Sequence, residues 1–367
     1  MRLDDLRRSS RYRVRQSRQP AAIEKQFASN DYLSLSQHRR LIKAATDALE
    51  QWGTGSSGSP LLSGYTEQHR LLEEELADWL QVDSALLFSS GFAANHGVIT
   101  TLIEPAKKIH CDRLCHASIL EGVKHSQRRF KRFPHNHPET IKATADDWLI
   151  TEGTFSMDGD YAVQQAVAQQ VEQQQLNLML DDAHGLGVWG EQGRASYDEL
   201  KGQVRVLTGT FGKAFGVGGA FVAGTTDDMD ELIQFCREYI YSTSFPPAQA
   251  ASIRASLAII RSSEGEQRRQ QLAGNIELFK TLIRERGLDT IESDSPIQVW
   301  VVKDDQSALT LSEQLKKLGF VVSAVRPPTV PEGTSRLRFS LQADHSPEDI
   351  KQLFSAIDQC QDITIND

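Results

Sequence analysis

The sequence predicts an α/β protein with one large and one smaller domain. From residue 30 to about 250, short apolar segments alternate with helix-like stretches, which indicates a mainly parallel sheet with helices on both faces. Beyond residue 286 the pattern changes to that of a smaller α+β domain. A length of 367 residues agrees with two domains.

The changes of pattern also predict the boundaries. We expect a polar N-terminal arm over residues 1–28, the large domain over 29–250, a connecting helix over 251–285 and the small domain over 286–367. The strands expected in the large domain are 85–88, 148–150, 176–180, 204–207 and 220–222.

The small domain is expected to hold an antiparallel sheet. A helix with leucines between 309 and 318 leads into a strand over 320–325, and residues 335–341 alternate polar and apolar side chains. Ser346 followed by Pro347 and two acids predicts the start of a last helix, because a serine cap, an early proline and acids in the first turn favour helix N-termini.

Composition excludes several classes of function. The chain has 40 Lys and Arg against 49 Asp and Glu, a net charge of −9, which argues against nucleic acid as a partner. No apolar run approaches the roughly 18 residues of a membrane span, so no membrane partner is expected. We expect a cytoplasmic protein.

The N-terminal arginines and the four cysteines could indicate a transit peptide, disulfide bonds or a metal site, but the neighbouring residues do not favour these interpretations. The arginines within residues 2–18 resemble a transit peptide, but Asp4 and Asp5 intervene, so a solvated basic arm is expected. Four cysteines make no disulfide framework in a chain of this length. Cys111, Cys115 and His116 lack a second ligand pair, and no metal is expected.

One lysine stands out as a catalytic candidate. Lys213 lies in the glycine-rich turn 208–219, directly after the expected strand 204–207. An amine held among few competing charges can lose its proton and attack a carbonyl. Asp181 and His184 lie at the mouth of another expected strand. A lysine that forms a Schiff base and a carboxylate for a pyridinium nitrogen are what pyridoxal 5′-phosphate (PLP) requires.

A phosphate site is expected at the start of the helix after strand 85–88. Gly91 and Phe92 open that helix, so their N–H groups can point at an anion, and Thr210 can add a hydroxyl. An ordinary strand-to-helix turn is the alternative. The glycine-rich segment 53–65 has no lysine and is not a nucleotide P-loop.

Four motifs in this order resemble the α-oxoamine synthase family, PLP enzymes of fold type I with an aminotransferase-like fold. They are residues 90–95, 151–160, 181–185 and 210–213. The resemblance extends from about residue 30 to 357. It implies an acyltransferase that joins an amino acid to an acyl thioester and releases carbon dioxide.

The resemblance implies a role for each candidate. Lys213 carries the cofactor and then serves as acid–base catalyst at the substrate α-carbon. Asp181 keeps the pyridine nitrogen protonated, and His116 stacks on the ring. His184 and Ser156 face the phenolic oxygen. Taken alone, a histidine such as His116 is more often structural, and Asp182 rather than Asp181 suits a helix N-cap.

The resemblance also implies a homodimer with shared active sites. In the family a hydroxyl from the neighbouring subunit reaches the phosphate, and Ser242 or Thr243 is expected to supply it.

Substrate-binding residues are expected in two places. Arg326, with Thr329 in the same segment, matches the family's arginine for the amino-acid carboxylate, with a buried ion pair as the alternative. Arg8, Arg11 and Arg13 compete for the place of an N-terminal arginine that contacts substrate.

Residues 63–65, 241–248 and 326–338 resemble most the branch of the family that acts in biotin biosynthesis. That branch joins L-alanine to a pimeloyl thioester carried by CoA or acyl carrier protein. A glycine-using relative such as glycine C-acetyltransferase is the nearest alternative. A protein of this fold without cofactor is a different class, which Lys213 and Asp181 argue against.

Overall fold

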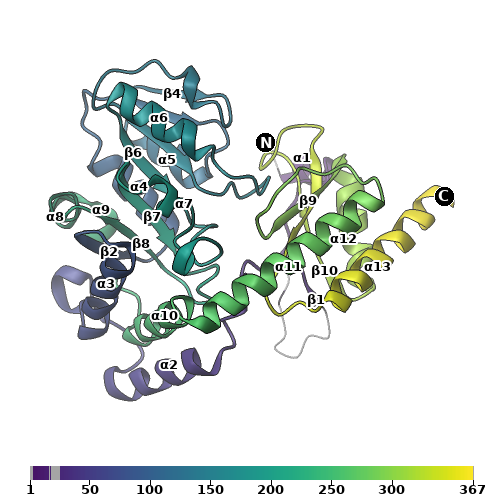
Figure 1. The fold of residues 1–367 in the computed structure, drawn as a ribbon, viewed down its shortest axis with the longest axis horizontal. Helices are drawn as coiled ribbons and strands as arrows, with labels where there is room; N and C mark the ends of the chain where they lie inside the picture. The colour runs from purple at the N-terminus through teal and green to yellow at the C-terminus, as the bar shows by residue number, and fades with distance from the viewer. Residues whose placement is uncertain (1–2, 16, 18–24, 367) are drawn as a thin grey trace. The chain divides into compact units, whose positions relative to one another are not determined.

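The computed structural model describes residues 3–15, 17 and 25–366 (Figure 1). Arg2 and Arg18 of the predicted basic arm lie outside the described residues. The chain forms two compact units: unit 1 comprises Met1–Tyr32, Ser156–Asp160 and Arg268–Asp367, and unit 2 comprises Leu33–Phe155 and Tyr161–Gln267.

Unit 2 is built on a seven-stranded sheet with the order β2-β8-β7-β6-β5-β3-β4 (Figure 1). Its strands are β2 (Ser84–Phe88), β3 (Ile109–Asp112), β4 (Phe130–Phe133), β5 (Trp148–Glu152), β6 (Asn177–Asp181), β7 (Val204–Thr210) and β8 (Ala220–Gly224). Only the pairs that involve β8 are antiparallel. The predicted α/β fold with a mainly parallel sheet is confirmed.

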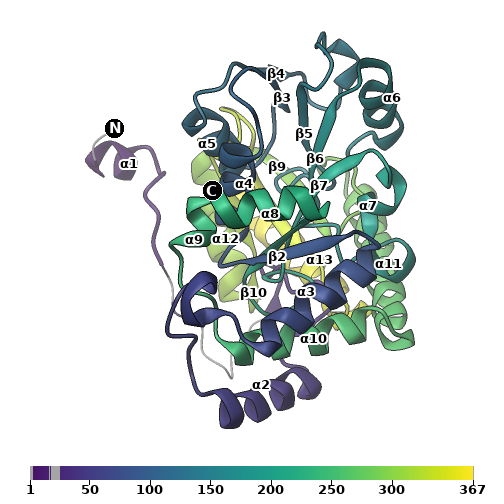
Figure 2. The ribbon, with the colours of Figure 1, turned by 90° about the vertical axis from the view of Figure 1, so that its left-hand side faces the viewer.

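Helices surround this sheet. They are α2 (Arg39–Trp52), α3 (Glu67–Leu80), α4 (Gly91–Thr101), α5 (Ala117–His125), α6 (Gln164–Gln174), α7 (Ala195–Leu200), α8 (Thr226–Phe235), α9 (Arg237–Ile240), α10 (Pro247–Ile260), and the short turns η1 (Pro60–Gly64), η2 (Pro138–Thr140) and η3 (Glu191–Gly193). Helix α10 packs against α2 and α3, and the three lie together in both ribbon views (Figures 1 and 2).

The apolar runs of the sequence form these strands because both faces of the sheet are covered. Every residue of β3, β5 and β8 is buried, so no polar–apolar alternation is needed. Met179 and Val206 pack into one apolar cluster with residues of α4, α5 and α8. Their neighbours Leu178 and Leu207, also buried, point to the opposite face of the sheet.

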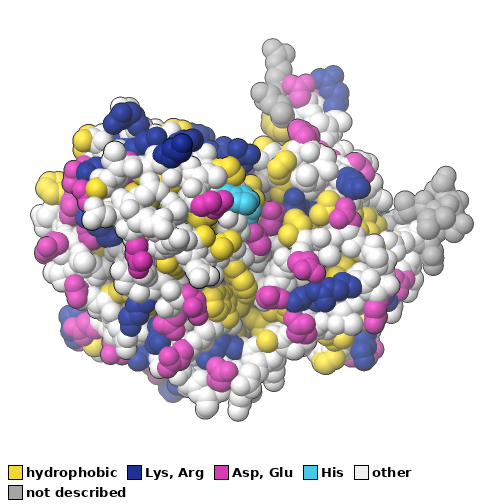
Figure 3. All heavy atoms as spheres, turned by 45° about the horizontal axis from the view of Figure 1, so that its top comes forward, with side chains coloured by type: hydrophobic (Ala, Val, Ile, Leu, Met, Phe, Trp, Pro, Cys, Tyr) yellow, Lys and Arg dark blue, Asp and Glu magenta, His cyan; other side chains and the backbone are white. Residues whose placement is uncertain are grey.

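The edge strand β4 is protected by charge. Its first three residues, Phe130, Lys131 and Arg132, are exposed. Lys and Arg side chains gather over the end of unit 2 where β4 lies (Figure 3). Charged side chains on an edge strand discourage pairing with another chain.

Unit 1 contains an antiparallel sheet of β11 (Ser323–Val325), β12 (Ser335–Ser340) and β9 (Ile297–Lys303), in that order. A second, parallel pair joins β1 (Lys25–Gln26) to β10 (Phe320–Val321). Its helices are α1 (Leu3–Arg8), α12 (Asp305–Lys317) and α13 (Pro347–Asn366). The predicted antiparallel sheet is confirmed.

Two details differ from the expected elements. The single strand expected over 320–325 is wrong: β10 and β11 pair in different sheets and are separated at Val322. In place of one helix over 251–285, α10 is followed by α11 (Ser263–Glu285). At the start of α13, the Asp349 N–H donates to Ser346 Oγ at 3.1 Å, which confirms the predicted cap. Within the described part of the chain, no helix combines the length and apolarity that a bilayer crossing needs.

Candidate active site

The carboxyl ends of three neighbouring strands bring the candidate residues of unit 2 together. Glu152 at the end of β5 lies opposite Asp181 at the end of β6, and Asp181 lies opposite Thr208 in β7. Lys213 follows three residues after β7 ends. Ligand sites of open α/β sheets lie at this edge.

Asp181 is held in one orientation by hydrogen bonds to both carboxylate oxygens. Asn95 Nδ2 donates to Oδ2 at 2.6 Å, and the Ala183 N–H donates to Oδ1 at 3.0 Å. The side chain is buried, with 6 % of its surface exposed. Because each carboxylate oxygen can accept two hydrogen bonds and each has one donor here, Asp181 retains capacity for a further donor at each oxygen.

Asn95 connects Asp181 to the neighbouring candidates. Its Oδ1 accepts from Thr208 Oγ1 at 2.7 Å, and its Nδ2 also lies 2.9 Å from Ser118 Oγ. Ser118 Oγ in turn lies 2.8 Å from His116 Nδ1. One buried amide therefore joins a β-strand hydroxyl, the carboxylate and the imidazole.

His116 is the N-cap of α5 and is held as a neutral ring. Its Nδ1 accepts from the Ser118 N–H at 3.2 Å, which leaves Nε2 to carry the proton. Burial lowers the pKa of His116; the charge of Asp181 opposes this and that of Lys213 adds to it. The neutral imidazole can donate a hydrogen bond from Nε2.

Glu152 was missed by the sequence analysis. It accepts a hydrogen bond from the His116 N–H. Burial, and then the charge of Asp181, raise the pKa of Glu152 well above its usual range. Its position directly after the apolar residues 148–150 was the available signal, but its meaning depends on the pairing of β5 with β6.

Lys213 is fixed by a tight turn between β7 and β8. The Phe211 N–H donates to Gly219 O at 2.9 Å, and the Gly216 N–H donates to Lys213 O at 2.8 Å. Gly216 has a φ of +70°, and a Cβ there would lie 2.5 Å from Ser36 N, so this position needs glycine. The Lys213 side chain is half-buried, and its charge acts on both His116 and Glu152.

The expected phosphate residues also lie together. Phe88 at the end of β2 and Thr210 at the end of β7 pair with the same residue, Ala220 of β8. A Cβ built on Gly91 would meet Thr210 Cβ at 4.0 Å, so the first turn of α4 opens beside that hydroxyl. First-turn N–H groups of a helix lack intrahelical acceptors and attract anions. Phe92 in this turn is 50 % exposed.

Ser242 and Thr243 lie in the segment between α9 and α10. They line a small cavity of about 20 Å³ together with residues of the end of β2, among them Ser89. The part they play at a phosphate stays a prediction.

The turn after β6 holds His184 and Asp182. His184 is buried, with 6 % of its surface exposed. The N-cap suggested for Asp182 is wrong, because residues 182–190 form turns rather than a helix. Asp182 is instead fully buried, and burial together with the charge of Asp181 raises its pKa to about 7.

Unit 1 holds the remaining candidates. Ser156 is buried, and its carbonyl accepts from Arg338 Nε at 2.8 Å. Arg8 is exposed and pairs with Asp5 at 2.7 Å. Neither Ser156 nor Arg8 lines the cavity shared by three other arginines of this unit, Arg11, Arg13 and Arg326.

Three arginines of unit 1 line one cavity of about 260 Å³: Arg11, Arg13 and Arg326, with Thr329. Arg11 pairs with both Asp305 and Glu332. Arg13 Nη2 donates to Thr329 Oγ1 at 3.2 Å.

Arg326 lies in this cavity without an ion pair to a carboxylate among the residues that the structure describes. It donates to the Ser10 carbonyl, and its Nε is buried with no acceptor among the described residues. Burial lowers its pKa; Asp305 opposes this, whereas Arg13 and Arg11 add to it. Converging guanidinium groups of this kind suit a carboxylate.

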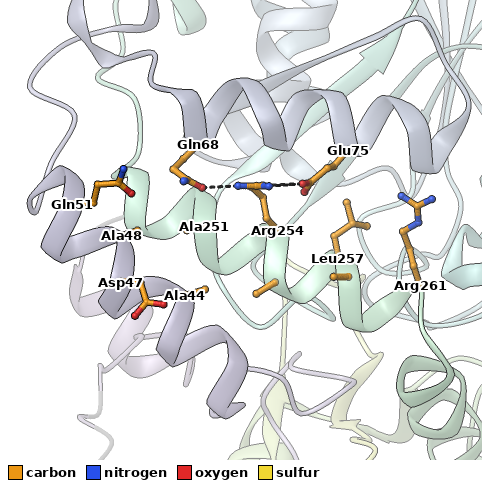
Figure 4. A pocket seen from close by; sticks show the side chains of 12 residues that line it. Ala44, Asp47, Ala48, Gln51, Gln68, Glu75, Ala251, Arg254, Leu257 and Arg261 are labelled. Atoms are coloured by element: carbon orange, nitrogen blue, oxygen red, sulfur yellow. Dashed lines mark hydrogen bonds and ion pairs between the residues drawn. The ribbon is translucent and has the colours of Figure 1, made fainter.

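A groove of about 580 Å³ lies elsewhere in unit 2, between α2, α3 and α10 (Figure 4). Arg254 of α10 bridges Glu75 and Gln68 of α3 there, at 2.7 and 2.8 Å. None of the candidate site residues lines this groove.

The sheet topology and the placement of Lys213 define an aminotransferase-like enzyme fold. The model of the family "Aminotransferase class I and II" matches residues 24–357. The chain belongs to this family.

Particular relatives narrow the comparison. The chain is 47 % identical over 337 residues to 8-amino-7-oxononanoate synthase of Enterobacter sp. (strain 638), covering 90 % of this chain and 88 % of that protein. A solved 8-amino-7-oxononanoate synthase from Francisella tularensis has a TM-score of 0.80 at 28 % identity, covering 94 % of this chain and 98 % of that one. A serine palmitoyltransferase from S. paucimobilis with a bound PLP–myriocin aldimine has a TM-score of 0.87 at 27 % identity, covering 92 % and 87 %.

Proposed function

We propose that this chain is an 8-amino-7-oxononanoate synthase of biotin biosynthesis. The reaction is the PLP-dependent condensation of L-alanine with a pimeloyl thioester of CoA or acyl carrier protein, with loss of carbon dioxide. The observation that carries the proposal is the 47 % identity to a synthase of that name over 90 % of the chain. The arrangement of Lys213, Asp181 and His116 supports it.

The residues of unit 2 fit PLP by their chemistry. Asp181 is a buried carboxylate with both oxygens oriented and room for a further donor, as a protonated pyridine nitrogen requires. Lys213 offers an amine in a rigid turn. Gly91 leaves open space at the first turn of α4 beside Thr210, where a phosphate can meet N–H donors.

When bound, PLP supplies an electron-accepting ring that stabilises a carbanion at the substrate α-carbon. Asp181 would hold the proton on the ring nitrogen, and Asn95 would fix the direction of that carboxylate. Lys213 would anchor the cofactor and move the α-proton at its Nζ. His116, neutral and protonated at Nε2, would donate a hydrogen bond to developing negative charge. His184 and Ser156 would bind the phenolic oxygen.

For substrate binding we propose Arg326 and Arg13. Two carboxylates already occupy Arg11, and Arg8 is exposed and outside the cavity. Arg326 has a buried Nε to offer, and Arg13 reaches Thr329 in the same cavity. A bidentate contact from a planar guanidinium would orient a substrate carboxylate.

We also propose a cytoplasmic homodimer in which Ser242 or Thr243 contributes a hydroxyl to the phosphate of the neighbouring subunit. Sedimentation of the holoprotein tests the dimer, and a monomer that retains full turnover would contradict shared active sites.

Product analysis tests the reaction. The purified holoprotein is incubated with L-alanine and pimeloyl-CoA, or with pimeloyl-acyl carrier protein, and the products are identified by mass spectrometry. We expect 8-amino-7-oxononanoate in at least one case. A product from glycine and acetyl-CoA, with none from alanine, would instead identify a glycine C-acetyltransferase.

A further inference from the structure

Helix α3 presents two polar side chains, the buried His69 and the half-buried Glu73, that the proposed mechanism does not use. They are four residues apart and therefore lie on one face of the helix. Both line the small cavity that also contacts Ser89 and Ser242.

His69 holds the segment that leads into α10. Its Nδ1 accepts from the Thr66 N–H at 3.1 Å, so Nε2 carries the proton and donates to Phe245 O at 2.8 Å. Ser56 Oγ donates to the same carbonyl at 2.7 Å. Burial lowers the pKa of His69, which agrees with this neutral ring. The Phe245 carbonyl is thus fixed by two buried donors.

The same segment is seated on the glycine-rich residues 56–64. The Ser244 N–H donates to Gly58 O at 3.0 Å. A Cβ on Gly64 would lie 2.1 Å from Gly58 O and 2.7 Å from Ser244 Oγ, so only glycine fits at this position between the two segments. Ser242 and Thr243 therefore directly precede two residues that are held in place: Ser244 by Gly58, and Phe245 by His69 and Ser56.

Glu73 holds the end of β2 that leads into the phosphate turn expected in this same subunit. Its Oε1 accepts from the Leu87 N–H at 3.2 Å, and its Oε2 accepts from Tyr65 Oη at 2.6 Å. Leu87 is one residue from the end of β2, and the turn into α4 with Gly91 follows. One face of α3 thus binds the segment expected at the phosphate of this subunit and the segment expected at the phosphate of its neighbour.

We propose that His69 is a positioning residue for cofactor phosphate: through the Phe245 carbonyl it sets where Ser242 and Thr243 lie, and so where their hydroxyls meet the phosphate of the neighbouring subunit. This inference rests on the proposed PLP-dependent function. It assigns to His69 no contact with cofactor or substrate.

The test compares PLP with pyridoxal, which lacks the phosphate. Dissociation constants of both are measured by absorbance titration of apoprotein, for the native chain and for His69→Ala. We expect PLP to bind about tenfold more weakly to the variant, the size of one lost hydrogen bond, and pyridoxal to bind unchanged. His69→Gln, which keeps an N–H donor, should recover most of the affinity for PLP.

Two further variants complete the test. His137→Ala, at an exposed histidine of the same unit, should change neither constant. Should His69→Ala not fold, Ser56→Ala removes the other donor to Phe245 O and should show a smaller loss specific to PLP.

The inference is overturned if His69→Ala binds PLP normally, or weakens PLP and pyridoxal equally. Absence of PLP binding by the native chain would instead overturn the proposed function, and this inference with it.

Discussion

Asn95 donates a hydrogen bond of 2.6 Å to Asp181 and accepts one of 2.7 Å from Thr208. The same amide lies 2.9 Å from Ser118, whose hydroxyl reaches His116. The carboxylate proposed for the ring nitrogen is therefore oriented by Asn95 directly, and the imidazole proposed to stack on the ring is connected to the same side chain through Ser118.

Replacement of Asn95 by alanine should lower kcat strongly while the protein still folds with a reduced free energy of unfolding. Asp181 loses its Oδ2 partner, and we expect kcat to fall by about tenfold or more, with about 1–3 kcal/mol lost from the free energy of unfolding. Steady-state kinetics and urea unfolding measure the two effects. Thr208→Val is the matched control, because it removes the bond to Asn95 Oδ1 but leaves Asp181 paired. Equal kcat values for the two variants would contradict the role of Asn95.

Replacement of Lys213 by alanine should abolish turnover and covalent attachment of the cofactor. Borohydride reduction of the holoprotein followed by peptide mass spectrometry should locate PLP on the peptide that contains Lys213. The exposed Lys201 gives the control variant, Lys201→Ala, which should retain both properties. Modification at another lysine would exclude the assignment.

The pH dependence of stability should carry a contribution from Glu73. Burial raises its pKa to about 7, against the opposing effect of the Tyr65 and Leu87 hydrogen bonds. A carboxyl with a raised pKa binds more protons in the folded state than in the unfolded state. The free energy of unfolding therefore falls as pH rises from the ordinary Glu range towards 7, by up to about 1.4 kcal/mol per pH unit.

Glu73→Gln removes this titration. Urea unfolding of the apoproteins at pH 5, 6, 7 and 8 should show the native chain losing stability relative to Glu73→Gln between pH 5 and 7, and little further change above. Glu74→Gln, at the adjacent exposed residue, should track the native chain. Parallel curves for all three proteins would show that Glu73 does not titrate in this range.

Substitution of Arg326 in the arginine cavity should change the KM for substrate more than it changes kcat. Arg326→Lys keeps the charge but not the planar pair of donors, so we expect the KM for alanine to rise by about tenfold or more with a smaller change in kcat. Arg8→Lys is the control at an arginine outside the cavity and should leave both constants unchanged. An unchanged KM in Arg326→Lys would contradict the proposed contact between Arg326 and the substrate carboxylate.

The sequence was sufficient for features that depend on local pattern. Apolar runs predicted five of the seven strands of unit 2 but not β3 or β4, and the cap at Ser346 was predicted from its neighbours. Lys213 and Asp181 were recognisable because each follows a strand, and strands of a parallel sheet end at one edge.

Features that depend on pairing between distant segments could not be predicted. Glu152 becomes informative only when β5 is placed beside β6, and Asn95 only when α4 is placed over β7. The choice between Arg11 and Arg13 depends on Asp305 and Glu332, which lie about three hundred residues along the chain and occupy Arg11. The break at Val322 arises because two partner strands, far apart in sequence, divide one apolar run.

Strand β8 runs against the direction of its neighbours and carries none of the proposed site residues. Its Ala220 nevertheless pairs with Phe88 on one side and Thr210 on the other. Phe88 at the end of β2 and Thr210 at the end of β7 thus lie two inter-strand steps apart, each of about 4.8 Å. Main-chain pairing through β8 therefore fixes the positions of these two strand ends, and the turn after β2 returns Gly91 to within 4.0 Å of Thr210 Cβ, measured from a Cβ built on the glycine.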